Sequence, residues 1–168
     1  AHAAYIPAKA MLAQWLLEDA WDRSRQGELA ARPWPWADTH PVARIRQARL
    51  GIDQVALAGA SGRVLAFGPG HVTASAAPGD MGNVVLSGHR DTHFGWLREV
   101  HRDDELQLEL PDGRVLRYAV LRSAVHHESE VGLLDPDAGD GLRLITCYPF
   151  NALVPGGPLR YVVEARLL

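Results

Sequence analysis

The feature of this sequence that most restricts its fold is a series of short apolar segments, separated by glycine and proline, that runs from Pro41 to the C-terminus. Short segments with alternating polarity are typical of β-strands, and glycine between them permits tight turns. The segments that we interpret as strands are Val42 to Leu50, Ile52 to Leu57, Asn83 to Leu86, Glu105 to Leu110, Arg114 to Leu121, Leu142 to Thr146 and Arg160 to Ala165. Strands do not alternate regularly with helices, so the pattern predicts a mostly-β domain, either a closed barrel or a sandwich.

The N-terminal region has a different pattern. Between Ile6 and Gln26, apolar residues recur at helical spacing, with Pro7 suited to the first turn, which predicts a helix that packs on the rest of the chain. The stretch from Ala30 to Pro41 contains two Pro-Trp pairs, and proline favours an extended path, so we expect a linker whose Trp rings lie on a surface. The predicted organisation is residues 1–37 as helix and linker, and residues 38–168 as one β domain.

Composition limits the functions that this chain can have. At 168 residues with 47% hydrophobic residues, it is large enough to bury a core. The net charge of −3 argues against nucleic acid as a partner, because nucleic-acid binding depends on a positive field. No window approaches the roughly 20 apolar residues that a membrane span needs.

The single cysteine, Cys147, is the candidate nucleophile. It ends the apolar segment that starts at Leu142 and precedes Tyr148-Pro149-Phe150, so the thiol lies where a strand opens into a loop. A cysteine in an apolar strand can also be simply a small core residue. A catalytic cysteine reacts as the thiolate and needs a nearby imidazole or other cation.

His89 is the candidate imidazole among the eight histidines. It follows an apolar strand within the segment Gly88-His89-Arg90-Asp91, although a histidine there can also merely cap the strand. Asp91 is a candidate to orient His89 or, equally, to stabilise the turn. The histidines that we interpret as loop or surface residues are His71, His93 and His101.

Arg160 is the third candidate. Acyl transfer requires positive or hydrogen-bonding groups where negative charge develops on the substrate carbonyl. Arg160 follows a Pro-Gly-Gly-Pro-Leu segment at the start of the last strand, next to the Cys147 strand if consecutive strands pair. Taken alone, it could be an ordinary surface arginine.

The sequence predicts no metal site and no cofactor. His126 and His127 are adjacent, so on a strand their side chains point to opposite faces, and one cysteine cannot complete a Cys/His ligand set. The acidic runs at 103–105 and 135–140 are interpreted as solvated loops. A thiol also supplies a covalent step without a cofactor.

Three segments together resemble the signature segments of the sortase family, in the family's order. They are Gly88-His89-Arg90-Asp91, Leu144-Ile145-Thr146-Cys147 and Arg160-Tyr161-Val162-Val163. The resemblance runs from about Asp38 to the C-terminus and departs from the family at Arg143, where sortases carry a threonine. The residues after Cys147 and the Gly-Gly-Pro before Arg160 are most similar to class GN, the sortases of Gram-negative, largely marine proteobacteria. The resemblance implies an eight-stranded sortase-type β-barrel with short helices, preceded by the N-terminal helix.

The resemblance also implies a reaction. Cys147 would attack the carbonyl of a Thr in a C-terminal sorting signal of the LPxTG kind, and His89 would protonate the departing amine. A thioacyl enzyme would result, and a second amine would resolve it. Arg160 would bind the substrate backbone or the developing oxyanion. Thr146 and Tyr148 are expected to contact the substrate, and Thr146 also to steady the loop at the nucleophile.

The implied partners are one dedicated target protein that bears the sorting signal and an amine acceptor whose identity is unknown. The expected location is the inner membrane, with the catalytic domain facing the periplasm. The sequence starts at Ala1 without a methionine, and we expect an N-terminal anchor outside it. The N-terminal helix is expected to lie against the barrel, with a lid as the alternative, and the loop from Val125 to Gly141 to gate the substrate groove.

Two other functions remain open at this point. A cysteine protease with the same three residues would hydrolyse its substrate rather than transfer it. A β-barrel binding module would keep the fold with an inert thiol, although such a module has no need for Cys, His and Arg at the ends of strands.

Overall fold

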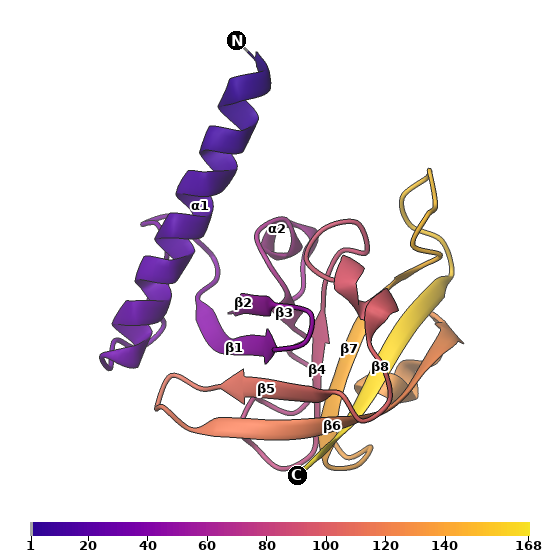
Figure 1. Ribbon diagram of the computed structural model, residues 1–168. Helices are drawn as coiled ribbons and strands as arrows, with labels where there is room; N and C mark the ends of the chain where they lie inside the picture. The colour runs from indigo at the N-terminus through magenta and orange to yellow at the C-terminus, as the bar shows by residue number, and fades with distance from the viewer. Residues whose placement is uncertain (1) are drawn as a thin grey trace.

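The computed structural model describes residues 2–168 and contains one closed β-barrel (Figure 1). The strands are β1 (Pro41–Gln47), β2 (Ile52–Ala58), β3 (Gly70–His71), β4 (Asn83–Ser87), β5 (Glu105–Glu109), β6 (Val115–His127), β7 (Gly141–Tyr148) and β8 (Leu159–Leu167). The helices are α1 (His2–Arg25), α2 (Gly62–Leu65) and the 3-10 helices η1 (Gly95–Glu99) and η2 (Val131–Leu134). The expectation of a mostly-β, eight-stranded barrel with short helices and an N-terminal helix is confirmed.

The strands close in the order β1-β2-β3-β4-β7-β8-β6-β5. Two pairs are parallel, β2 with β3 and β4 with β7, and the other neighbours are antiparallel. Alternate side chains of β1 are buried, as expected of a strand with one face toward the barrel interior. The interior is filled mainly by Ile45, Leu86, Phe94, Leu106, Leu108, Leu142, Leu144 and Val163.

Three strands differ from the sequence prediction. β1 ends at Gln47, three residues before the expected end at Leu50. β3 has only two residues, too few to show any alternation of polarity. β6 extends to His127, six residues beyond the expected end at Leu121. The second half of β6 carries polar residues on the outer face, where the Arg122 side chain donates a hydrogen bond to Glu164 of β8. The alternation of apolar residues is therefore lost there, although the strand continues.

Helix α1 starts at His2, four residues before the predicted start. Leu17 and Trp21 are buried against Val55 and Leu57 of β2, so the helix lies against the barrel as expected. Its N-terminal half projects beyond the barrel (Figure 1). None of the helices in the described residues is both long enough and apolar enough to cross a membrane.

The segment between α1 and β1 is irregular and behaves only partly as predicted. Trp34 packs edge-on against Phe67, with ring centroids 4.9 Å apart. Trp36 is 79% exposed. The expectation that both Trp rings lie on a surface is therefore right for Trp34 and wrong for Trp36.

Candidate active site

The ends of β4 and β7 lie side by side because the two strands are parallel neighbours. Ser87 is the register partner of Ile145, and the Gly88 amide donates a 3.1 Å hydrogen bond to the Ile145 carbonyl. His89 comes two residues after Ser87, and Cys147 comes two residues after Ile145, so both residues lie just beyond the same end of this paired segment. Neighbouring strands are about 4.8 Å apart, so the two segments meet at one edge of the barrel.

Thr146 joins these two segments through its side chain. Its hydroxyl donates a 2.7 Å hydrogen bond to the carbonyl of Gly88, which is the residue before His89. Thr146 is only 2% exposed, so it has almost no surface for a substrate contact. The structure thus places Thr146 where it can steady the nucleophile strand, and the expected contact with substrate stays a prediction.

The turn that carries His89 is fixed by a close contact beneath it. A Cβ atom at Gly88 would lie 2.7 Å from the Phe94 ring, so only glycine fits there without movement of the ring. Phe94 is fully buried in the barrel interior, and its amide donates to the His89 carbonyl at 2.9 Å. His89 itself is exposed at the surface of this turn.

Arg160 lies directly opposite Cys147 in the antiparallel pair of β7 and β8. Directly opposed residues project to the same face of a sheet, with Cα atoms about 5 Å apart. The guanidinium is therefore presented on the face that carries the thiol, as expected from the pairing of consecutive strands. Figure 1 shows β7 and β8 side by side, with the connecting loop beyond their ends.

The Arg160 guanidinium has partners of its own in this structure. It donates hydrogen bonds to the carbonyls of Gly157 and Leu159, at 2.8 and 2.9 Å, and to the Glu128 carboxylate at 3.1 Å. These acceptors occupy donors that a substrate carbonyl would need. Any substrate bound by Arg160 must therefore replace or share some of them.

His126 lies opposite Arg160 on the other neighbour of β8. Its ring nitrogen Nδ1 lies 2.7 Å from the Glu130 carboxylate, and this hydrogen bond lowers the pKa of Glu130. His126 and Glu130 thus form a second polar pair beside Arg160.

Cys147 faces the outside of the barrel, next to an apolar cluster. Ile145 lies two residues before it on the same face and packs with Val85 and Val162, all three buried. Leu133 and Leu134 of η2 pack against this cluster from the loop between β6 and β7. The half-buried thiol therefore lies at the end of the cluster of Val85, Ile145 and Val162, called the apolar floor below, which the loop partly covers.

Aromatic rings surround the start of the loop between β7 and β8. Tyr148 stacks on Tyr161, with centroids 6.1 Å apart, and Phe150 packs edge-on against both rings. The Arg98 guanidinium lies 5.5 Å from the Phe150 centroid. Tyr148 is partly exposed beside Cys147, and its expected contact with substrate stays a prediction.

Arg90 is a residue of this site that the sequence analysis quoted but to which it gave no role. Arg90 is 9% exposed. Its guanidinium donates hydrogen bonds to the carbonyls of Val154, at 2.7 Å, and Gly156, at 3.3 Å. It thus connects the His89 turn to the loop between β7 and β8. The only sequence signal was its position next to His89.

His93 is less exposed than expected. Its Nδ1 atom is buried without a hydrogen-bond partner within the described residues. Burial lowers the pKa of His93, and the nearby His89 adds to this effect. His93 lies in a turn, as the interpretation of it as a loop or surface residue predicted, but its Nδ1 atom is buried rather than exposed. Asp91 is exposed, and no hydrogen bond between its carboxylate and the His89 ring is found between residues 2 and 168.

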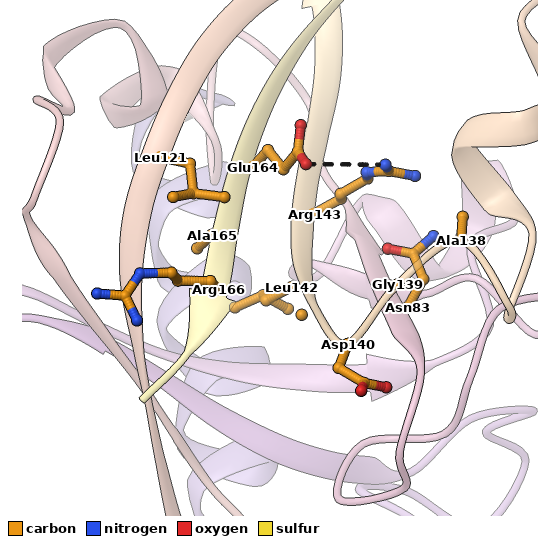
Figure 2. Close-up of a pocket in the computed structure, with 11 residues that line it drawn as sticks. Asn83, Leu121, Ala138, Gly139, Asp140, Leu142, Arg143, Glu164, Ala165 and Arg166 are labelled. Carbon is orange, nitrogen blue, oxygen red and sulfur yellow. Dashed lines mark ion pairs between the residues drawn. The ribbon is translucent and has the colours of Figure 1, made fainter.

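A small cavity of about 60 Å³ lies at the opposite end of β7 from Cys147 (Figure 2). Its lining includes Asn83, Arg143 and Glu164, and an ion pair joins the last two at 3.9 Å. Hydrogen bonding from Arg122 lowers the pKa of Glu164. In the part of the chain that the structure describes, no group of three His, Cys, Asp or Glu side chains is arranged to hold a metal ion.

Solved sortase structures share this fold. Sortase A from Corynebacterium diphtheriae superposes with a TM-score of 0.69 at 21% identity, over 100% of this chain and 96% of that chain. The Clostridium perfringens Sortase D5 transpeptidase has a TM-score of 0.67 at 22% identity, over 90% and 88% of the two chains. The catalytic domain of B. anthracis SrtD is 31% identical, with a TM-score of 0.65, over 76% of this chain and 87% of that chain.

Sequence comparison gives the same relationship. Sortase D of Bacillus subtilis (strain 168) is 33% identical over 100 residues, which are 59% of this chain and 50% of that protein, so the chain matches about half the length of this relative. The family model described as "Sortase domain" matches residues 45–168. This match includes the strand ends that carry His89, Cys147 and Arg160, and the chain belongs to the sortase family.

Proposed function

We propose that this chain is a cysteine transpeptidase that cleaves an LPxTG-like C-terminal sorting signal and transfers the product to an amine. The observation that carries this proposal is the meeting of three strand ends at one edge of the barrel. Arg160 is the direct register partner of Cys147, and His89 follows the strand that runs parallel beside Cys147. Membership of a family of cysteine transpeptidases supports the same reaction.

In the proposed first half-reaction, the Cys147 thiolate, paired with protonated His89, attacks the carbonyl carbon of the signal's threonine. The C–N bond then breaks, and His89 gives its proton to the departing amine. The products are a thioacyl enzyme and the released C-terminal fragment. In the second half-reaction an acceptor amine attacks the thioester carbonyl, His89 takes the proton from that amine, and the Cys147 thiolate leaves.

Arg160 is proposed to bind the carbonyl oxygen on which charge develops. Donors placed at such an oxygen stabilise the transition state more than the ground state. In the free enzyme the Gly157 carbonyl and the Glu128 carboxylate occupy this guanidinium. We therefore propose that substrate binding exchanges at least one of these acceptors for the substrate's carbonyl.

The apolar floor beside Cys147 supports a substrate with an apolar side chain upstream of the cleaved bond. Val85, Ile145 and Val162 form this floor, and η2 covers part of it. We propose that the loop between β6 and β7, which carries η2, borders the groove for the signal. Burial of an apolar side chain on this floor would contribute to binding in proportion to its area.

The narrower expectations from sequence belong to this proposal. They are membership of class GN, a single dedicated target protein, and an anchor that holds the catalytic domain on the periplasmic side of the inner membrane. Fractionation of cells that express the complete protein, with protease added to intact spheroplasts, tests the location. Recovery in the soluble cytoplasmic fraction would contradict it.

The central experiment mixes the protein with candidate sorting peptides and measures its intact mass. We expect a covalent adduct on the wild-type protein that is absent in Cys147→Ala. His89→Ala is expected to slow adduct formation strongly, whereas His101→Ala, which changes an exposed histidine, serves as the matched control.

The two alternative functions give different results in the same experiment. Adduct formation followed only by hydrolysis, even with excess amine, would indicate a cysteine protease. A Cys147 thiol that forms no adduct and resists alkylation would indicate a binding module with an inert cysteine.

A further inference from the structure

The loop between β7 and β8, residues 149–158, has few attachments to the barrel. Its tip is open to solvent, with Leu153 fully exposed and Val154 75% exposed. The loop nevertheless begins two residues after the nucleophile and ends two residues before Arg160. Whatever holds this loop therefore bears on the position of Arg160, whose guanidinium donates to the Gly157 carbonyl of the loop.

Arg90 supplies the main polar attachment of the loop. The hydrogen bonds that its guanidinium donates, among the described residues, go to the Val154 and Gly156 carbonyls. A guanidinium that is largely buried must be satisfied by hydrogen bonds, because removal of a charge from water is otherwise strongly unfavourable. The positions of Arg90 and of these two carbonyls are therefore interdependent.

The carbonyl next to those held by Arg90 is bound by Arg160. Arg90 donates to Gly156, and Arg160 donates to Gly157 at 2.8 Å. Both glycines have positive φ angles, +87° and +99°, which residues with a side chain rarely adopt. The Gly156-Gly157 segment thus presents successive carbonyls to two arginines, so the location of one arginine restrains the other.

We propose that Arg90 is a positioning residue that fastens the loop between β7 and β8 to the His89 turn and thereby sets the orientation of Arg160. This inference rests on the proposed function, because its kinetic consequence requires a transpeptidase. One guanidinium then links the three segments that carry His89, Cys147 and Arg160. Arg98, placed over Phe150 at the start of the same loop, is a second and weaker attachment.

The test replaces Arg90 by lysine, which keeps the charge but cannot offer the planar fork that reaches two carbonyls. We expect kcat/KM for a sorting peptide to fall about 10-fold to 100-fold, as misplacement of a catalytic group by about an ångström can do. The loss should lie mainly in kcat, because Arg160 acts on the carbonyl where charge develops. Arg102→Lys, an exposed arginine that follows η1, is the matched control.

Two further measurements separate fastening of the loop from a general loss of structure. Thermolysin cleaves before exposed leucine and valine, so it should cut at Leu153 and Val154 faster in Arg90→Lys than in Arg102→Lys. Alkylation of Cys147 by iodoacetamide should proceed at the wild-type rate, since the thiol and its strand are unchanged. If Arg90→Lys does not fold, Gly156→Ala, which strains the loop at the same carbonyl, should give the same pattern.

The inference is overturned by unchanged cleavage of the loop, by unchanged peptide turnover, or by a large fall in alkylation of Cys147. Absence of turnover in the wild-type protein would instead contradict the proposed function. In that case faster cleavage of the loop in Arg90→Lys would still support the attachment, and equal cleavage would refute it.

Discussion

Thr146 and Gly88 are joined by a buried hydrogen bond of 2.7 Å, from the threonine hydroxyl to the glycine carbonyl. Each residue directly precedes a proposed catalytic group, since Cys147 follows Thr146 and His89 follows Gly88. The bond therefore fixes the relative positions of the two segments just before the residues that must cooperate. Such a contact can be removed without changing either catalytic side chain.

Thr146→Val is expected to lower both stability and activity. The substitution keeps the shape of the side chain but leaves the Gly88 carbonyl without this donor, which costs about 1–3 kcal/mol for a buried group. Thr39→Val is the matched control, because Thr39, just before β1, is also buried (4% exposed) and its hydroxyl donates to the carbonyl of Ala58, the last residue of β2. Urea unfolding should show a loss in both variants, whereas peptide turnover should fall only in Thr146→Val. Equal turnover in the two variants would contradict this role.

Gly88→Ala is expected to distort the His89 turn. The new Cβ would lie 2.7 Å from the ring of Phe94, which is fully buried and has little room to move. Overpacking of this kind costs about 1–3 kcal/mol. Gly62→Ala, which nothing approaches within 4 Å and which lies in α2, should be neutral or slightly stabilising. Thermal unfolding and peptide turnover of the two variants measure the difference, and a fully active Gly88→Ala protein would refute it.

The parts of the site that the sequence predicted are those set by neighbouring strands. Arg160 was expected beside Cys147 because consecutive strands commonly pair, and β7 and β8 do so. His89 was chosen as the partner of Cys147 because it follows an apolar strand and because its segment resembles the sortase signature. The structure adds the parallel pairing of β4 with β7, which brings those strand ends together. Strand geometry was sufficient for Arg160 but not for His89.

The parts that the sequence could not predict depend on contacts between distant segments. Arg90 looks like any other arginine until the loop between β7 and β8 folds back over it, 64 residues later in the chain. His93 has the polarity of a surface residue, yet the packing of its turn buries Nδ1. The end of β6 carries no apolar pattern because its outer face is solvated, so only pairing with β8 reveals the strand.

His93 should make folding stability depend on pH near neutrality. Burial, together with a smaller effect of His89, lowers the pKa of His93 below its ordinary value of 6.5. The unfolded chain then binds a proton at His93 more readily than the folded chain. This contribution to stability is therefore present above about pH 6.5 and is lost as the pH falls toward the folded-state pKa.

The measurement for His93 compares the free energy of unfolding at about pH 7.5 and about pH 5.5. The decrease on acidification should be smaller in His93→Gln than in the wild type. His101→Gln, at an exposed histidine, should keep the wild-type decrease. His40, whose pKa burial also lowers, is unchanged in all three proteins. An equal decrease in His93→Gln and the wild type would show that His93 does not contribute.

The buried face of α1 can be weakened by a single substitution, which tests whether the helix supports the barrel or acts as a lid. Leu17 is 1% exposed and contacts the barrel, whereas Leu12 on the same helix is 57% exposed. Leu17→Ala should therefore destabilise the protein by about 2–4 kcal/mol, and Leu12→Ala should change stability by no more than about 0.5 kcal/mol.

The peptide turnover of Leu17→Ala, measured per folded molecule, distinguishes a supporting helix from a lid. The helix lies against β2 and α2. In the barrel, β3 and β4 separate β2 from β7 and β8, whose ends carry Cys147 and Arg160. A supporting helix predicts unchanged peptide turnover per folded molecule, measured well below the unfolding temperature. A lid predicts faster turnover in Leu17→Ala, because weaker packing would free the groove more often. We expect the first result, since the buried face of α1 is occupied by barrel residues.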